Sequence, residues 1–492
     1  MRVPALALSV LLLPACADGD MPGIPPMPDD GVEAEQPTWR LTGDFSLDQP
    51  RGALVLGDAP GSHAGWSVGP AGDLNGDGYG DVVVGAYSDD RGGDYAGATF
   101  VFHGPIEGDL TASNADAVLI GEDAYDYSGW TAGPAGDVNG DGIDDVYVSA
   151  YGDDTVGPGS GAVYVVYGPV SGERSLADAD VTIYGAAAYD NAGIAAASAG
   201  DLNADGIDDL VVGSYGCDAG GADAGAAFVF MGPLEGQLNT NNAHVQINGV
   251  MPGQWVGYAV AGAGDVNADG RDDLLVGAVG TAARGEDSGA AFLFLGPITS
   301  DRTVVQADAI LHGEAAGDRL GAHVATAGDV NGDGYADVLV GTPYADIAGQ
   351  EDAGAAYVIY GPWADTRYAG NADAVLYGSD ADDQAGFSVS SAGDIDGDGL
   401  DDVVVGVLHD DRGEIDAGAA AVFYGPVSGA RSVTAADVSF LGLAGGDRAG
   451  GAVAGAGDVN GDGRADLLVG AHGHDAQGND AGAAWLVLGG GY

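Results

Sequence analysis

One stretch of the chain, AGDVNGDGIDDV, places side-chain oxygens at alternating positions inside an otherwise apolar segment. If Asp137 is counted as position 1, oxygen-bearing side chains also stand at positions 3, 5 and 9, and Gly142 stands at position 6. Calcium takes six to eight hard oxygen ligands, often including the backbone carbonyl at position 7, and glycine at position 6 permits the sharp turn around the ion. The stretch therefore predicts a calcium-binding loop.

The same loop occurs seven times, at intervals of 64 or 65 residues. We predict up to seven Ca²⁺ ions, one for each copy. The expected side-chain ligands are Asp73, Asn75, Asp77, Asp81, Asp137, Asn139, Asp141, Asp145, Asp201, Asn203, Asp205, Asp209, Asp265, Asn267, Asp269, Asp273, Asp329, Asn331, Asp333, Asp337, Asp394, Asp396, Asp398, Asp402, Asp458, Asn460, Asp462 and Asp466. The expected carbonyl ligands are Tyr79, Ile143, Ile207, Arg271, Tyr335, Leu400 and Arg464.

Two other interpretations of the loop compete with a calcium site. An EF-hand would need a bidentate Glu at position 12 and flanking helices, whereas position 12 here is apolar, as at Val84 and Val148. A metal-free hairpin turn rich in Asx residues would use the same residue types. Seven copies that each crowd three or four carboxylates together favour the cation, because these charges repel one another at close range.

The repeat also predicts the fold. Each copy holds four short apolar runs separated by turn residues, which in the second copy are AVLIGE, GWTAGPAG, DVYVSA and AVYVVYG. Runs of this length and composition are typical of strands. Four strands per unit and seven units predict an all-β, seven-bladed β-propeller of four-stranded blades. The run at residues 53–57 has no blade of its own, so we expect this N-terminal strand to complete the last blade and close the ring.

The N-terminus is typical of an export signal. Residues 1–15 combine an early Arg2 with an apolar run, and LPAC resembles a bacterial lipoprotein signal in which Cys16 is lipidated. Cleavage after Ala17 is the alternative. We expect residues 16–44, rich in proline and acid, to form a tether and residues 45–492 to form the propeller. The protein would then be a cell-surface or outer-membrane lipoprotein, or secreted, with Cys217 as a free thiol.

The charge excludes some partners. The chain has 75 acidic residues and 14 basic ones, all of them arginine, and a formal charge of −61. Nucleic acids and anionic membranes bind clustered cations, so neither is an expected partner. Contact with a membrane is expected only through a lipid anchor.

The segment GWSVGPAGDLNGDGYGDVVVGA resembles the FG-GAP repeat of integrin α-subunit heads and their bacterial relatives, and the resemblance covers roughly residues 45–490. It implies a seven-bladed propeller with calcium in the hairpin loops that join the first two strands of a blade. Two departures stand out. The FG pair is degenerate here, as at Gly193-Ile194, and the proline of GAP survives only as Pro343. The integrin β subunit does not carry over as a partner, because no residue here identifies a contact with one.

A ligand is expected on the face opposite the calcium loops, where the more varied loops combine acids with tyrosines. The family resemblance also points to this face. The alternative is a solvated acidic rim that keeps the protein soluble. The tyrosines in these loops are Tyr87, Tyr95, Tyr125, Tyr127, Tyr151, Tyr189, Tyr215 and Tyr344.

These patterns favour a binding or adhesion module on the cell surface, with an unknown protein or glycan as its ligand. A lectin-like glycan binder is the near alternative, and a glycan-active enzyme such as a polysaccharide lyase or hydrolase is a weaker one. GWSVG at residues 65–69 matches the nucleophile elbow of hydrolases, but that elbow requires a helix after the turn, and a calcium loop follows here. His472 and His474 are a weak candidate for a transition-metal site.

Overall fold

The computed structural model describes residues 40–48, 52–106 and 108–490. The chain divides into two units, Met1–Thr38 and Trp39–Tyr492. The first unit, with the expected signal, the lipidation site Cys16 and most of the tether, lies outside the described residues. The architecture below is that of the second unit.

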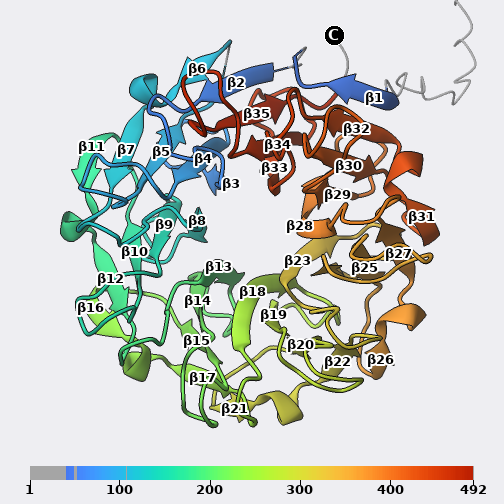
Figure 1. The fold of residues 1–492 in the computed structure, drawn as a ribbon. Coiled ribbons are helices and arrows are strands. Elements are labelled where there is room, and N and C mark those ends of the chain that lie inside the picture. Colours follow the sequence, from blue (N-terminus) through green and yellow to red (C-terminus); the bar gives the residue numbers. More distant parts are fainter. Residues whose placement is uncertain (1–39, 49–51, 107, 491–492) are drawn as a thin grey trace, which may run out of the picture. The chain divides into compact units, whose positions relative to one another are not determined.

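The second unit is a ring of seven sheets, and each sheet has five strands (Figure 1). The sheets are numbered here as blades in chain order, and the strands of a blade run from the centre of the ring outward. The chain is thus a seven-bladed, all-β propeller, as predicted from the 64-residue period. Among the described residues, no helix is long and apolar enough to cross a membrane.

The strands of blades one to four are as follows. Blade one contains β3 (Ser67–Gly72), β4 (Asp81–Ala86), β5 (Ala98–Phe102), β7 (Ala117–Ile120) and β11 (Gly172–Ser175). Blade two contains β8 (Ala132–Gly136), β9 (Asp145–Ala150), β10 (Ala162–Val166), β12 (Val181–Tyr184) and β16 (Gly236–Asn239). Blade three contains β13 (Ala195–Gly200), β14 (Asp209–Ser214), β15 (Ala226–Phe230), β17 (Val245–Asn248) and β21 (Arg302–Thr303). Blade four contains β18 (Val256–Gly264), β19 (Asp273–Ala278), β20 (Ala290–Phe294), β22 (Ala309–His312) and β26 (Thr366–Tyr368).

The last three blades follow the same plan. Blade five contains β23 (His323–Gly328), β24 (Asp337–Thr342), β25 (Ala355–Ile359), β27 (Ala374–Tyr377) and β31 (Gly429–Ser432). Blade six contains β28 (Ala385–Gly393), β29 (Asp402–Val407), β30 (Ala419–Phe423), β32 (Val438–Leu441) and β1 (Gly43–Ser46). Blade seven contains β33 (Ala452–Gly457), β34 (Asp466–Ala471), β35 (Ala483–Val487), β2 (Gly52–Leu56) and β6 (Leu110–Thr111). The 3-10 turns are η1 (Ala112–Asn114), η2 (Leu176–Asp178), η3 (Thr240–Asn242), η4 (Val304–Gln306), η5 (Ala369–Asn371) and η6 (Val433–Ala435).

The fifth strand of each blade was not predicted. In blades one to five and seven it comes from the connection between the third and fourth strands of the following blade, and it pairs in parallel with the outer strand. In blade two, for example, Val181 of β12 is paired with Gly236 of β16. These segments are short and lack the apolar run that is typical of a strand, so their sequence predicts a loop. In the structure each of them pairs with the neighbouring blade and so connects the two blades.

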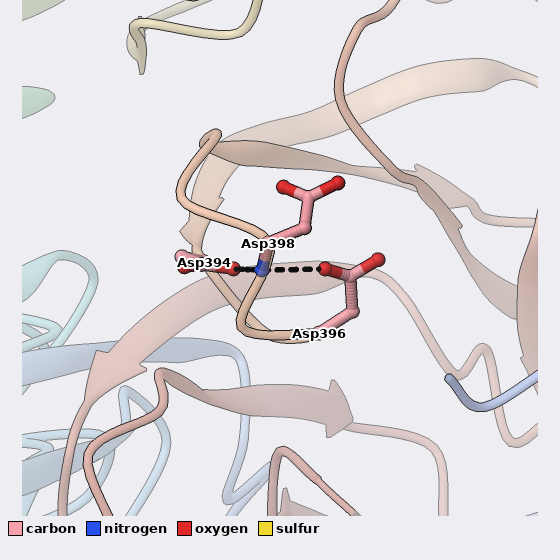
Figure 2. Close-up of side chains that lie close together, drawn as sticks. All are labelled: Asp394, Asp396 and Asp398. Atoms are coloured by element: carbon pink, nitrogen blue, oxygen red, sulfur yellow. Dashed lines mark hydrogen bonds between the residues drawn. The ribbon is translucent and has the colours of Figure 1, made fainter. Parts of the chain in front are cut away.

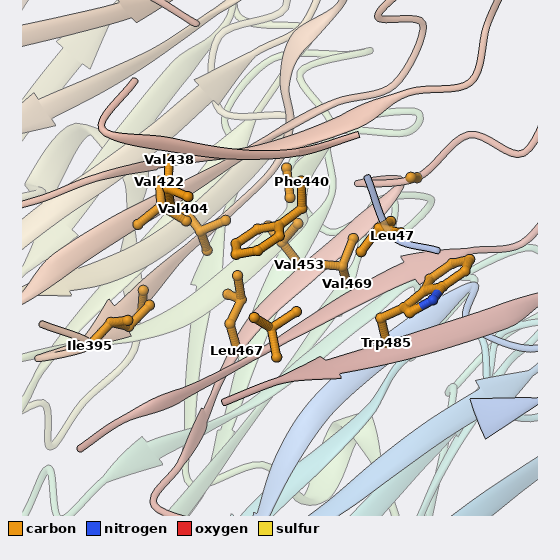
Figure 3. Packing of buried hydrophobic residues seen from close by; sticks show 14 of the residues in the cluster. Leu47, Ile395, Val404, Val422, Val438, Phe440, Val453, Leu467, Val469 and Trp485 are labelled. Atoms are coloured by element: carbon orange, nitrogen blue, oxygen red, sulfur yellow. The ribbon is translucent and has the colours of Figure 1, made fainter. Parts of the chain in front are cut away.

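The core lies between neighbouring sheets. Each second strand is buried along its whole length, because both of its faces pack against adjacent blades. Figure 3 shows this packing between blades six and seven, where Phe440 of blade six belongs to the same buried cluster as Val453 and Leu467 of blade seven, and where Leu47 and Trp485 are almost fully buried. Full burial of such a side chain stabilises the fold by about 1.5–3 kcal/mol.

The ring closes between the two ends of the described chain. Strand β2 pairs antiparallel with β35, with Leu54 opposite Trp485, so the prediction that residues 53–57 complete the last blade is confirmed. Figure 1 shows β1 and β2 beside β32 and β35.

A second closing strand was missed by the sequence analysis. Strand β1 pairs in parallel with β32 and supplies the fifth strand of blade six. The carbonyl of Leu41 accepts a hydrogen bond from the Tyr424 hydroxyl at 3.0 Å, a contact that the Leu234 carbonyl makes with Tyr167 in blade two. Residues 40–44, which the sequence analysis placed in the tether, therefore contact the propeller.

Candidate cation loops and the opposite face

Each predicted calcium loop joins the first and second strands of a blade. The hairpin turns tightly because the residues at positions 4 and 6 adopt left-handed backbone conformations, as at Gly140 (φ 79°) and Gly142 (φ 89°) in loop two. Position 6 is always glycine, whereas position 4 is alanine in loops three and four, at Ala204 and Ala268. The apolar residue at position 2 anchors the loop, and Val138 is fully buried. The seven loops repeat this arrangement on one face of the ring.

The aspartate at position 1 organises the turn. In loop two, Asp137 Oδ1 accepts hydrogen bonds from the backbone N–H groups of Gly140 (2.7 Å) and Asp141 (3.0 Å), and Oδ2 accepts one from Gly142 (2.8 Å). The bonds from positions 5 and 6 recur in all seven loops. The aspartate at position 5 in turn accepts the N–H of position 7, as Asp141 does from Ile143 at 3.0 Å.

The aspartate at position 9 connects the loop to the rest of its blade. Asp145 is fully buried, and its two carboxylate oxygens accept N–H bonds from Val138 (3.1 Å) and from Gly168 of the third-to-fourth strand connection (3.0 Å). The same two bonds occur in every blade, and in blade seven Gly489 takes the place of the Gly-Pro glycine. Burial raises the pKa of Asp145, Asp209 and Asp337 to about 7, although the backbone hydrogen bonds oppose the shift.

This arrangement fits a hard divalent cation. The donors are all oxygens, they are preoriented by backbone N–H groups, and a buried carboxylate without a counter-charge is unfavourable. In loop two, Asp137, Asn139, Asp141, Asp145 and the position-7 carbonyl would hold the ion. The ion would neutralise the crowded carboxylates and fix the hairpin.

A further aspartate, at position 8, was missed by the sequence analysis. The N–H of Asp73 donates to Asp144 Oδ2 at 2.8 Å, and Asp137 donates in the same way to Asp208 at 2.9 Å. Asp272 and Asp401 make the equivalent bond to the preceding blade. The signal was present in the DD pair that precedes four of the second strands, but only the ring geometry shows that the first aspartate of the pair reaches the neighbouring loop.

The opposite face holds a cavity of about 410 Å³ at the centre of the ring. It is lined by the innermost strands and, in each repeat, by the second residue of the degenerate FG pair, such as Trp66 in Gly65-Trp66. These seven residues are Trp66, Trp130, Ile194, Tyr258, Ala322, Phe387 and Gly451. At these positions, blades one and two therefore contribute large aromatic side chains to the cavity, whereas blades five and seven contribute an alanine and a glycine.

Aromatic rings extend from this cavity across blades one and two. The ring centroids of Trp66 and Trp130 are 4.7 Å apart, Tyr87 lies 4.8 Å from Trp66, and Tyr151 lies 4.6 Å from Trp130. We call Trp66, Tyr87, Tyr127, Trp130 and Tyr151 the aromatic arc. Tyrosines were predicted on this face, but the tryptophans were not, because they lie within repeats that read as strand.

The other candidates are placed as follows. Ser67 begins strand β3, and a hairpin rather than a helix follows it, so GWSVG is not a nucleophile elbow. His474 Nδ1 lies 3.2 Å from Asp447 Oδ2, and the His472 ring packs on Trp66 at 4.9 Å. Among the described residues neither histidine belongs to a group of three metal-ligating side chains. Cys217 is a free thiol, as expected.

Comparison with known proteins supports the repeat assignment. The FG-GAP repeat model matches residues 64–102, 128–166, 320–359 and 449–487. Each matched segment contains the first three strands of a blade and its loop.

Three relatives illustrate the range of similar proteins. Integrin alpha pat-2 of Caenorhabditis briggsae is 34% identical over 254 residues, which cover 47% of this chain and 19% of that protein. Integrin alpha-PS2 of Drosophila melanogaster is 32% identical over 196 residues, or 37% of this chain and 14% of that protein. Phosphatidylinositol-glycan-specific phospholipase D of Rattus norvegicus is 32% identical over 246 residues, or 47% of this chain and 28% of that protein.

The match thus spans less than a third of each of these three relatives. The protein is thus a seven-bladed β-propeller that contains four FG-GAP repeats and is similar, over part of its length, to part of the integrin alpha chains.

Proposed function

We propose that the protein is an exported, calcium-binding propeller that acts as a binding or adhesion module on the cell surface. One observation carries this proposal: the seven loops on one face repeat the same bonds, whereas the opposite face is varied and carries a cavity beside an aromatic arc. Repetition is expected of a structural ion site, and a concave, largely apolar and aromatic cavity is typical of a ligand site. The similarity to integrin alpha chains supports a binding role.

Export rests on the N-terminal sequence. The expected lipid anchor at Cys16, or free secretion after cleavage at Ala17, would place the propeller outside the cell, where calcium is plentiful enough for moderate-affinity sites. Metabolic labelling with a fatty acid, compared between the wild type and Cys16→Ser, tests the anchor. Loss of label with retained secretion would support lipidation, and an unlabelled wild type would favour ordinary cleavage.

A lectin-like glycan binder is the second candidate. The rings of Trp66 and Trp130 at the cavity offer flat apolar surfaces, and Ser67 and Thr131 beside them offer hydroxyl groups. A glycan-active enzyme is a third candidate. One of the similar proteins, a phospholipase D, is an enzyme, and this similarity supports considering an enzymatic activity. A glycosidase would need two carboxylates at the ligand. The cavity lining within the described chain offers hydroxyl, imidazole and guanidinium groups instead.

Binding to a glycan array and to immobilised extracellular proteins, in calcium and in EDTA, tests the function. The wild type is compared with the double variant Trp66→Ala/Trp130→Ala and with Ile415→Ala, whose side chain is exposed on the same face of blade six. We expect the double variant to lose at least about tenfold in affinity, since aromatic anchors dominate such sites. Unchanged binding by the double variant would mean that the ligand site lies elsewhere.

A further inference from the structure

Loop six differs from the other six loops in charge. Its position 3 is Asp396, where the other loops have asparagine, so it carries four carboxylates rather than three. Figure 2 shows Asp394, Asp396 and Asp398 around the turn, with the N–H of Asp398 between two carboxylate oxygens at 3.0 Å each. One oxygen from each of these three residues lies within 4.8 Å of the others. Asp396 is 1% exposed, so its charge needs a partner.

Residues 40–46, which include β1 and which we call the closing segment, bring an arginine to this loop. Arg40 Nε lies 2.6 Å from Asp396 Oδ2, and its Nη2 donates to Asp398 Oδ2. Its guanidinium also lies 5.6 Å from the centroid of the Tyr424 ring. Tyr424 in turn holds the carbonyl of Leu41, so the arginine is placed by the same contact that docks the closing segment.

This arginine takes atoms that an ion would need. Asp398 Oδ1 already accepts the N–H of Leu400 at 3.0 Å, so with Arg40 on Oδ2 both oxygens of the position-5 carboxylate are engaged. The one comparable pair among the described loops is Arg271 with Asp269 in loop four, at 3.9 Å. Arg464 also contacts loop six, but it donates to the backbone carbonyl of Asp396 at 2.7 Å rather than to a carboxylate oxygen.

We propose that Arg40 takes the place of the calcium ion in loop six, so that the protein binds six ions and one internal guanidinium. The inference rests on the proposed calcium binding of the other loops. A divalent ion held by Asp396 and Asp398 would lie within roughly 5 Å of the guanidinium. At an effective dielectric constant of about 20, that repulsion weakens ion binding by several factors of ten. Loop six thus binds the closing segment to the ring instead of holding an ion.

Removal of Arg40 reverses the behaviour of the loop. With four carboxylates and no guanidinium, loop six of Arg40→Ala becomes the most acidic of the seven and binds calcium at least as tightly as the others. The matched control is Arg431→Ala, which also removes one positive charge, from β31 at the outer edge of blade five. Arg431 pairs with Asp437 at 3.0 Å, away from the ligand side chains.

The test counts bound calcium by elemental analysis and calorimetric titration of the full mature chain. We expect six ions for the wild type and for Arg431→Ala, and seven for Arg40→Ala. In EDTA, Arg40→Ala should also melt below Arg431→Ala, because Asp396 is then buried without a partner, and calcium should remove this deficit.

The outcomes separate the two proposals. A count for Arg40→Ala that does not exceed the wild type overturns the role of Arg40, as does a wild type with seven equivalent ions. No bound calcium in any of the three proteins overturns the calcium proposal itself.

Discussion

The two faces of the ring differ in how completely their side-chain hydrogen bonds repeat from blade to blade. On the loop face, the bonds of the position-1 and position-9 aspartates recur in all seven blades. On the opposite face one bond also recurs, since Asp190 and Asp447 each accept the N–H of the residue three positions earlier. The position beside that aspartate changes chemistry: in blade four it is Thr281, which accepts from Gln254 at 3.3 Å, and in blade seven it is His474, 3.2 Å from Asp447. The contrast supports the proposal that the loop face maintains the fold and that the opposite face holds the ligand site.

The largest expected effect comes from calcium removal, which acts on the loop face alone. One site held at a hundred times its dissociation constant adds about 2.7 kcal/mol, so several filled sites should raise the melting temperature by many degrees. Thermal unfolding in EDTA and then in millimolar calcium measures this, with magnesium as the control for ion specificity. An unchanged melting temperature would mean that the loops are metal-free turns.

Replacing one buried aspartate on each face compares how much each face contributes to stability. Asp209→Ala leaves the N–H groups of Leu202 and Gly232 without acceptors, and each unsatisfied buried donor costs about 1–3 kcal/mol. Asp190, on the opposite face of the same blade, accepts the N–H of Ala187 at 2.8 Å and is 8% exposed, so water can replace part of its bonding and Asp190→Ala should cost less. Chemical denaturation in calcium gives both values. Equal losses would argue against a special structural role for the loop face.

The opposite face should also contribute a distinct pH dependence. Burial, and secondarily the charge of Asp153, raises the pKa of Asp126 from 3.8 to about 7. The folded state therefore holds this proton more tightly than the unfolded state, so the stability from Asp126 is complete below about pH 4 and is lost as the pH rises through about 7.

In saturating calcium, the melting temperature of Asp126→Asn relative to the wild type should therefore rise by a few degrees between pH 4 and pH 8. Asp94→Asn, which changes an exposed carboxylate, is the control for net charge. A flat difference for Asp126→Asn across this range would contradict the assignment.

The smallest effect is expected at the bonds between loops. Asp144→Ala removes the acceptor of the Asp73 N–H and should cost about 1 kcal/mol, the typical net value of one hydrogen bond. Ala465, at the same position in loop seven, shows that the ring tolerates the loss at one boundary. A loss well above 1 kcal/mol, measured by denaturant titration in calcium, would show that the boundary carries more than this bond.

Periodicity made much of this structure predictable. The strict repeat predicts the number of blades. Residues 53–57 form a strand that precedes the first full repeat, and this position predicts how the ring closes. Strand β1 could not be found in this way, because its partner, β32, lies almost 400 residues away and its residues follow neither the loop pattern nor an alternating one. Arg40 was hidden for the same reason: its role depends on which loop the closing segment reaches. The aromatic arc arises because the ring brings together positions that are 64 residues apart.

The position-8 aspartates have a consequence for how the loops fill. They join loops one to two, two to three, three to four, and five to six, whereas Gly80, Ala336 and Ala465 stand at the other three boundaries. An ion that orders one hairpin thereby positions the carboxylate and N–H of its neighbour. If the loops bind calcium as proposed, they are therefore not independent receptors: loops one to four should fill as one cooperative block, and a calcium titration of this protein should be steeper than the sum of separate sites.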